Sequence, residues 1–299
     1  MSNFVQVQLP KAGLGHSLQP YARAFTYHAS GSAVFVHPYW FKLRIGPYLR
    51  KEMDKRNYHL IIRTPTTWGL APHNRWRRLF NRVVTEETFD PNSDGQFLVV
   101  TDDRQKNLFP RIDPCRSLFF NALNSISRVP MDPHPNKTPS IGIFHRSGDM
   151  RSWKPASTDE RIRRTHGYGY IPPEYAAEAL AKVRRIAGWN VPAVLSTDAD
   201  ASEVSSILSL GNITYARTDS ALTNMLEMSR HNVLIIGTSS YGKWSWFLGD
   251  AFAITPKIEN IEHNLLELPN RASAWFIFDN ETSLNDRDSE LELLKRLTR

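Results

Sequence analysis

The sequence predicts an α/β protein with two doubly wound domains, each built on a parallel sheet. Short apolar runs alternate with amphipathic stretches of helical length along most of the chain, which is the pattern of parallel strands joined by helices. The chain has 299 residues, enough for about two domains of ~150 residues. Its hydrophobic fraction of 41% and charged fraction of 22% fit a folded core and exclude intrinsic disorder.

The N-terminal half begins with a strand, a glycine-containing loop, a helix and a second strand. The loop reads KAGLGHSLQP, and the second strand is bounded by Gly31 and Pro38. This order is typical of a parallel α/β unit. Pro47, Pro65 and Pro72 interrupt any long element in the stretch that follows. The expected elements of this half are strands at residues 4–9, 32–37 and 96–101 and a helix from Ser17 to about Ala29.

A proline-rich segment separates the two halves. Residues 128–139 read RVPMDPHPNKTP, with four prolines in twelve residues, which favours a linker over a helix or a strand. We therefore expect an N-terminal domain at residues 1–135 and a C-terminal domain at residues 136–299.

The C-terminal half alternates regularly between strands and helices, which predicts a second doubly wound sheet. The expected strands cover residues 140–145, 191–196, 212–216, 232–237 and 274–278. The expected helices cover residues 173–187, 201–208, 219–229 and 243–252, and a last one begins at about Leu284.

Several classes of protein are excluded by what the sequence lacks. No apolar run approaches the ~20 residues that a membrane-spanning helix needs. The first residues, MSNFVQVQLP, show no basic segment followed by an apolar one, so we expect no secretory signal and a cytoplasmic protein. Cys115 is the sole cysteine, which excludes an intrachain disulfide and a thiolate zinc site.

Three polar segments follow expected strands of the C-terminal half, at the sheet edge where α/β proteins bind ligands. The first ends in Arg146 to Asp149, the second, VLSTDAD, contains Asp198, and the third contains Ser239 and Ser240 before a helix. Hydroxyls and N–H groups at a helix N-terminus bind anions, and an arginine adds a bidentate phosphate contact. Together these segments predict a pocket for a nucleotide diphosphate.

These segments resemble a known family. The stretches GLGHS, FHRSGD, LSTDAD and MSRHNVLIIGTSSYGKWSWFL occur in the order found in α-1,2-fucosyltransferase-like glycosyltransferases, a group related to α-1,6- and protein O-fucosyltransferases. The family patterns are a GLGNQ-like loop, H-x-R-R-G-D, a strand ending in S-D-D, and N-S-S-F-S-W-W. The resemblance extends from Gly13 to about Phe252.

The resemblance implies a GT-B fold, in which two Rossmann-like domains face each other across a cleft. It also implies a GDP-sugar donor, with L-fucose as the expected sugar, and an inverting mechanism that needs no metal. Without a metal, protein groups must neutralise the departing diphosphate. The residues expected to bind the donor are Gly13, Gly15, Ser17, Arg146, Ser196, Thr197, Asp198, Thr238, Ser239, Ser240 and Tyr241.

The chain also departs from the family patterns. Arg146 matches the first arginine of the family motif, but Ser147 stands in place of the second and Phe144 in place of the histidine. His16 and Ser17 replace the Asn-Gln pair of the N-terminal loop. In the last motif, Lys243 interrupts the tryptophan pair. These departures leave the identity of the sugar open.

The acceptor hydroxyl needs a group that takes up its proton, and four residues are candidates. His16 lies in the glycine loop and has an ordinary pKa near ~6.5, which suits a base, although it could instead bind a phosphate or the loop backbone. Asp149 could be this base or an ion-pair partner of Arg146. His145 also fits a core histidine, and Glu174 a first-turn helix residue. The expected catalytic set is Arg146, His16 and Asp149.

A metal site is an alternative reading of Asp198-Ala199-Asp200, because a D-x-D motif after a strand binds manganese in GT-A glycosyltransferases. Two phosphate-type segments in separate halves argue against that fold. We therefore expect no metal and no other cofactor.

Basic residues concentrate between Trp40 and Arg82, where eleven lysines and arginines face only two acids, an excess of nine. The whole chain carries +7, so its remainder is slightly acidic. Arg75, Arg77 and Arg78 flank Trp76 closely. Such a segment could contact an anionic membrane, a glycan or a nucleic acid. No nucleic-acid-binding motif accompanies it, so we do not expect a nucleic acid partner.

The sequence thus predicts a glycosyltransferase with a nucleotide-sugar donor and a glycan or lipid-linked glycan acceptor, and its basic segment allows a peripheral contact with an anionic membrane. Two alternatives remain open at this point. One is a transferase of the same fold that uses another nucleotide sugar, and the other is a basic nucleic-acid-binding α/β protein without enzymatic activity.

Overall fold

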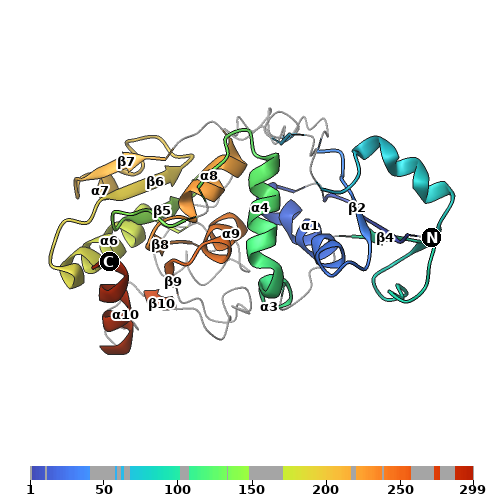
Figure 1. Ribbon diagram of the computed structural model, residues 1–299. Coiled ribbons are helices and arrows are strands. Elements are labelled where there is room, and N and C mark those ends of the chain that lie inside the picture. Colours follow the sequence, from blue (N-terminus) through green and yellow to red (C-terminus); the bar gives the residue numbers. More distant parts are fainter. Residues whose placement is uncertain are drawn as a thin grey trace.

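The computed structural model describes most of both halves of the chain (Figure 1). The described residues are 2–10, 12–40, 58, 62–63, 68–101, 108–132, 134–147, 171–216, 220–237, 239–256, 273–276 and 287–298. Asp149 and Thr238, both expected in the site, lie outside them.

The N-terminal half contains a parallel four-stranded sheet in the order β2-β1-β4-β3. Its strands are β1 (Phe4–Val7), β2 (Val34–Val36), β3 (Arg82–Val84) and β4 (Gln96–Val100). Three of these were expected from their apolar runs. The edge strand β3 was missed because it has three residues, two of them exposed, and so presents no apolar run.

The C-terminal half contains a parallel six-stranded sheet in the order β10-β9-β8-β5-β6-β7. Its strands are β5 (Ile141–His145), β6 (Ala193–Thr197), β7 (Ile213–Tyr215), β8 (Val233–Ile235), β9 (Phe252–Pro256) and β10 (Ser273–Phe276). The chain runs outward from β5 to β7, crosses back to β8 beside β5, and continues outward to β10. The strand order therefore reverses between β5 and β8, which makes that point the expected ligand crevice of a doubly wound sheet.

Helices connect these strands. In the C-terminal half they are α6 (Pro173–Ala187), α7 (Ser205–Leu208), α8 (Ala221–Met228), α9 (Ser240–Leu248) and α10 (Arg287–Leu297). The bounds of α6 agree with the expected ones because both ends carry local signals. Pro173 is the first helical residue, and Gly188 ends the helix in the left-handed conformation with φ 74°. None of the described helices is long and apolar enough to cross a bilayer.

A layer of helices joins the two sheets. Figure 1 shows α4 (Arg116–Ile126) standing between the half that contains α1 (Leu14–Ala29) and the half that contains α8 and α9. One continuous hydrophobic core includes side chains from all of these helices and from α3 (Leu108–Ile112). The indole of Trp244 lies 5.0 Å from the Phe109 ring and 5.7 Å from the Phe119 ring, measured between centroids. The α/β prediction with two parallel sheets is confirmed, and the boundary at residues 135/136 stays a prediction.

Two helices begin earlier than expected. α1 begins at Leu14, not Ser17, so Gly15 and His16 belong to its first turn. α9 begins at Ser240, not Lys243, because the Ser239 hydroxyl caps it by accepting from the Tyr241 N–H at 3.2 Å. It ends at Leu248, and the expected end at Phe252 is wrong because that residue starts β9.

Candidate functional site

The predicted donor segments meet at the reversal point of the C-terminal sheet. β5 ends at His145 and continues into Arg146, whose side chain is exposed, while the neighbouring strand β8 leads into the N-terminus of α9. β6, on the other side of β5, ends at Thr197. The three segments therefore lie on adjacent strands at one edge of the sheet, as expected. This edge can present a guanidinium, backbone N–H groups and hydroxyls to one ligand.

Ser147 holds the loop after β5 and is not directed to solvent. It is fully buried, and its N–H donates to Asp198 Oδ1 at 2.7 Å. Its hydroxyl donates to Glu203 Oε1 at 3.3 Å, and Glu203 Oε2 accepts from the Asp200 N–H at 3.0 Å. Asp198 thus uses one carboxylate oxygen to fix the loop that carries Arg146. Glu203 was not identified from the sequence, since nothing local marks an acid that binds a segment 56 residues away.

Asn224 of α8 connects two of the donor segments and was also missed. Its Oδ1 accepts from the Ser196 hydroxyl at 2.9 Å and from the Tyr241 hydroxyl at 3.0 Å. The Tyr241 ring makes an edge contact with Phe144, with centroids 5.5 Å apart. Side chains from β5, β6, α8 and α9 therefore form one wall behind the strand ends. The Tyr241 hydroxyl also donates to the Ala221 oxygen, so this side chain is held by α8.

The N-termini of α1 and α9 meet, although they belong to different sheets. A Cβ atom on Gly15 would lie 2.6 Å from Ser240 Oγ and 2.9 Å from the Tyr241 nitrogen, so only glycine permits this approach. Neither helix has an acidic residue in its first turn. Unpaired N–H groups and the helix dipole make each N-terminus attractive to anions. Their juxtaposition brings two such ends together.

The residues of the N-terminal glycine loop occupy different positions in α1. Gly13 is the N-cap residue, and Gly15 packs against α9. His16 lies in the first turn and is partly buried. Ser17 is buried, so its side chain lies inside the fold, behind the first turn. Donor contacts from Ser17 stay a prediction and would require its hydroxyl to face the ligand.

Lys243 is a buried lysine at the junction of the two halves. Lys243, Ser240 and Phe247 are three and four residues apart and share one face of α9. On this face, Ser240 lies against Gly15 of α1, and Phe247 stacks on Phe109 of α3 with centroids 4.5 Å apart. Lys243 therefore faces the N-terminal half.

The environment of Lys243 disfavours its charged form. Its exposed fraction is 8%, and this burial lowers the pKa of the Lys243 amine to about 8. No ion pair joins it to a carboxylate within the part of the chain that the structure describes. An anion bound nearby would restore the missing partner. The sequence showed Lys243 only as an interruption of the tryptophan pair.

The remaining proton-acceptor candidates differ in exposure. His145 is buried at the end of β5, and burial lowers its pKa below the ordinary value, with Asp198, Glu174 and Glu203 opposing that shift. Glu174 is exposed in the first turn of α6, where a carboxylate interacts favourably with the helix dipole. No group of three or more metal-ligating side chains occurs among the described residues.

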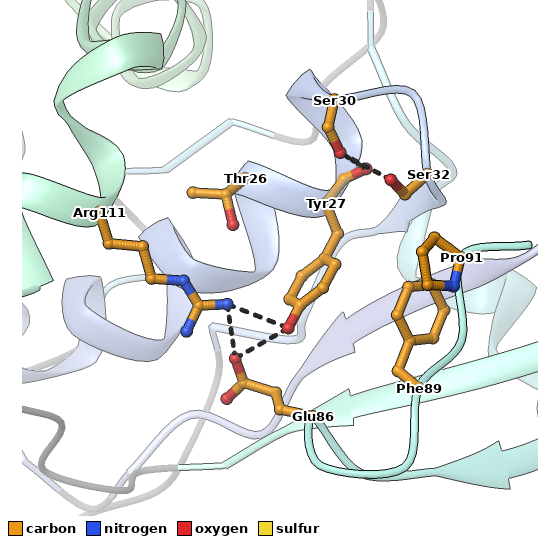
Figure 2. Close-up of a pocket in the computed structure, with 8 residues that line it drawn as sticks. All are labelled: Thr26, Tyr27, Ser30, Ser32, Glu86, Phe89, Pro91 and Arg111. Atoms are coloured by element: carbon orange, nitrogen blue, oxygen red, sulfur yellow. Dashed lines mark hydrogen bonds and ion pairs between the residues drawn. The ribbon is translucent and has the colours of Figure 1, made fainter.

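A separate hollow of about 370 Å³ lies on the N-terminal half and includes none of the expected site residues (Figure 2). Glu86 is one of the residues that line it, 3.2 Å from Arg111 and 3.1 Å from the buried Arg23. The Tyr27 hydroxyl donates to Glu86 and accepts from Arg111. Glu86 and both guanidinium groups are therefore engaged in contacts within the protein.

Comparisons with known proteins give similarities of fold at low sequence identity. No family model matches the chain, and no curated protein matches it. Fucosyltransferase NodZ from Bradyrhizobium aligns with a TM-score of 0.46 and 15% identity over 88% of this chain and 98% of its own. POFUT1 in complex with GDP-fucose aligns with a TM-score of 0.42 and 11% identity over 92% of this chain and 97% of its own. A glycosyl transferase family 9 protein from Veillonella parvula aligns with a TM-score of 0.43 and 12% identity over 99% of this chain and 96% of its own.

Proposed function

We propose that the chain is a glycosyltransferase that binds a nucleotide sugar where the strand order reverses and transfers the sugar to a hydroxyl group. The observation that carries this proposal is the meeting of the N-termini of α1 and α9, without an acidic residue in either first turn. The two halves each contribute one helix end. A diphosphate is the ligand whose charge and size best match such a pair.

Three groups neutralise the departing diphosphate in this proposal. Arg146 forms a bidentate contact with phosphate oxygens, and the N–H groups at the start of α9 donate to the same anion. Lys243 supplies the second positive charge, because Ser147 occupies the position of the second family arginine and is bound to Asp198 and Glu203. Together they stabilise the charge that develops on the leaving group. We therefore propose that no metal is needed.

The edge near β6 binds the nucleoside in this proposal. Thr197 and Asp198 follow β6, and Asp198 has one carboxylate oxygen engaged by Ser147. Guanine as the base and L-fucose as the sugar follow from the resemblance of the sequence motifs to fucosyltransferases. The acceptor is a glycan or a lipid-linked glycan.

We assign the proton acceptor to His16, with Asp149 as the second candidate. His16 lies in the first turn of α1, beside the paired helix N-termini. A neutral imidazole can accept a proton from the attacking hydroxyl as the bond to the leaving diphosphate breaks. Inversion at the anomeric carbon follows if attack and departure occur on opposite faces.

Thermal unfolding with GDP, UDP, CMP and a short RNA tests the proposal without knowledge of the acceptor. A specific ligand at a hundredfold excess over its dissociation constant stabilises the fold by about 2.7 kcal/mol. We expect a stabilisation of this size for GDP. Addition of EDTA should change neither this stabilisation nor the rate at which the donor is hydrolysed. Greater stabilisation by UDP than by GDP would indicate a UDP-sugar as the donor. Stabilisation by RNA alone, or by none of the four, would overturn the proposal.

A further inference from the structure

Large apolar side chains are exposed together at the outer end of the N-terminal half. They belong to the 3-10 helix η2 (Pro72–Leu79) and to the start of β3. The exposed fractions are 50% for Trp76, 81% for Leu79, 72% for Phe80 and 46% for Val83. Four such residues within eight positions form a patch, and exposed apolar patches mark interaction surfaces.

The geometry of η2 sorts its side chains into three rows. A 3-10 helix has three residues per turn, so residues i and i+3 lie directly above one another. Trp76 and Leu79 share one exposed row, and Arg75 and Arg78 share the next. The third row, which includes Arg77, is partly buried.

Arg77 turns toward the domain, unlike the exposed Arg75 and Arg78. Its guanidinium lies over the Phe4 ring at 4.9 Å and the Trp76 ring at 5.3 Å. Arg75 lies over the Tyr39 ring at 4.7 Å and stays exposed. The outward cations of this region are Arg75, Arg78 and Arg82.

The segment that carries the patch is basic, with arginines at positions 75, 77, 78 and 82. Residues 69–85 contain no aspartate or glutamate. The next acid, Glu86, is occupied by Arg23 and Arg111 on the inner side. An apolar row therefore borders a row of arginines, as on helices that lie in the membrane interface.

We propose that this surface, formed by Trp76, Leu79, Phe80 and Val83 with Arg75, Arg78 and Arg82, binds an anionic lipid bilayer. The apolar side chains enter the boundary between headgroups and acyl chains, and the arginines contact lipid phosphates. Leu79 and Val83 have no ring on which a base can stack, so the composition favours lipid over single-stranded nucleic acid.

The position of the patch leaves the candidate site accessible. β3 is the edge strand of its sheet, and Figure 1 shows η2, in cyan, at the end of the molecule away from the C-terminal sheet. A bilayer on this side does not cover the N-termini of α1 and α9. The inference does not depend on the proposed function.

Flotation with vesicles of phosphatidylcholine and phosphatidylglycerol in equal parts tests the proposal at low and high salt. We expect wild-type protein to float with these vesicles at low salt and hardly at all with pure phosphatidylcholine. Leu79→Ser with Phe80→Ser should weaken binding at least about tenfold, since two inserted side chains are lost. Arg75→Gln with Arg78→Gln should weaken it by a similar factor and reduce its salt dependence.

Leu118→Ser and Arg185→Gln are matched controls, because both side chains are exposed on other helices. Both should bind vesicles as wild type does, and thermal unfolding should show all variants folded. The proposal is overturned if wild type does not bind anionic vesicles at low salt, or if both double variants bind unchanged. A lipid-free dimer that the Leu79 and Phe80 changes dissociate, without vesicle binding, would identify the surface as a contact between copies instead.

Discussion

Trp244 donates its indole N–H to the main-chain oxygen of Gly15 at 2.7 Å. Both residues are buried, and the bond fixes α9 against the first turn of α1. It therefore sets the spacing of the two helix N-termini on which the proposed donor site depends.

Gly15→Ala should separate these helix ends. The added Cβ would lie 2.6 Å from Ser240 Oγ and 2.9 Å from the Tyr241 nitrogen, and overpacking of this kind costs about 1–3 kcal/mol. We expect a lower melting temperature and weaker GDP binding by calorimetry. Gly13→Ala is the steric control for stability, since its nearest neighbour would be the Tyr58 hydroxyl at 3.8 Å. Equal stability and affinity of Gly15→Ala and wild type would contradict the packing argument.

Arg146→Ala should abolish donor turnover and leave the fold intact. Its side chain is exposed, so its removal creates no cavity, whereas the loss of a bidentate phosphate contact costs several kcal/mol in the transition state. Lysine at this position should restore little, because a point charge cannot form the fork. Hydrolysis of GDP-fucose without acceptor measures the effect. Retention of more than about a tenth of wild-type turnover, a loss below ~1.4 kcal/mol, would remove Arg146 from the site.

Lys243→Met should stabilise the protein and weaken GDP binding. The pKa of this amine is about 8 in the folded protein and 10.5 in its ordinary state. Below pH 8 the buried charge therefore costs about 3 kcal/mol, and that cost disappears as the pH rises from 8 to above 10.5. The free energy of unfolding of wild type relative to Lys243→Met should rise over this interval.

The same lysine predicts proton uptake upon ligand binding. A diphosphate next to the amine raises the pKa of Lys243, so at pH 8.5 wild type should take up protons when it binds GDP. Calorimetry in two buffers with different ionisation enthalpies measures the uptake, and Lys243→Met corrects for the titration of GDP itself. Equal uptake and equal affinity in both proteins would place Lys243 outside the donor pocket. Absence of GDP binding to wild type would instead refute the donor assignment.

Asn224→Ala should destabilise the wall behind the strand ends. It removes the acceptor of the half-buried Ser196 hydroxyl at 2.9 Å and one of the two acceptors of the Tyr241 hydroxyl at 3.0 Å, and the loss of a hydrogen-bond partner costs about 1–3 kcal/mol. Denaturant unfolding should show a loss of about 2 kcal/mol. Ser196→Ala combined with Asn224→Ala should cost less than the sum of the single changes. Strict additivity would show that the two side chains do not interact.

Glu86→Gln should destabilise the N-terminal half without affecting GDP binding. Arg23 is buried and pairs with Glu86 at 3.1 Å, and breaking a buried pair costs about 3–5 kcal/mol. Arg23→Met in the same chain should recover part of the loss, because the buried guanidinium is then removed. A change in the GDP affinity of Glu86→Gln, measured where this variant is fully folded, would link the hollow in Figure 2 to the donor site.

The fold was largely accessible from the sequence because its signals are local. α6 carries its own start at Pro173 and its own end at Gly188, and most strands are apolar runs between turn residues. The beginning of α9 was placed too late because Gly242 resembles a loop residue. In the structure Gly242 packs against Ile236 and Phe144, which lie within 3.3 Å of where its Cβ would be, and Phe144 is 98 residues away in sequence.

The sequence by itself determined the α/β class, the order of most strands and helices, and the three polar segments at strand ends, because periodicity, capping and strand direction are properties of neighbouring residues. Only the tertiary structure decided that Gly15 and Trp244, 229 residues apart, would bond, that Ser147 would be fixed by Asp198, and that Lys243 would be buried between the halves. Burial and pairing depend on which distant segments pack together, and no local pattern encodes that choice.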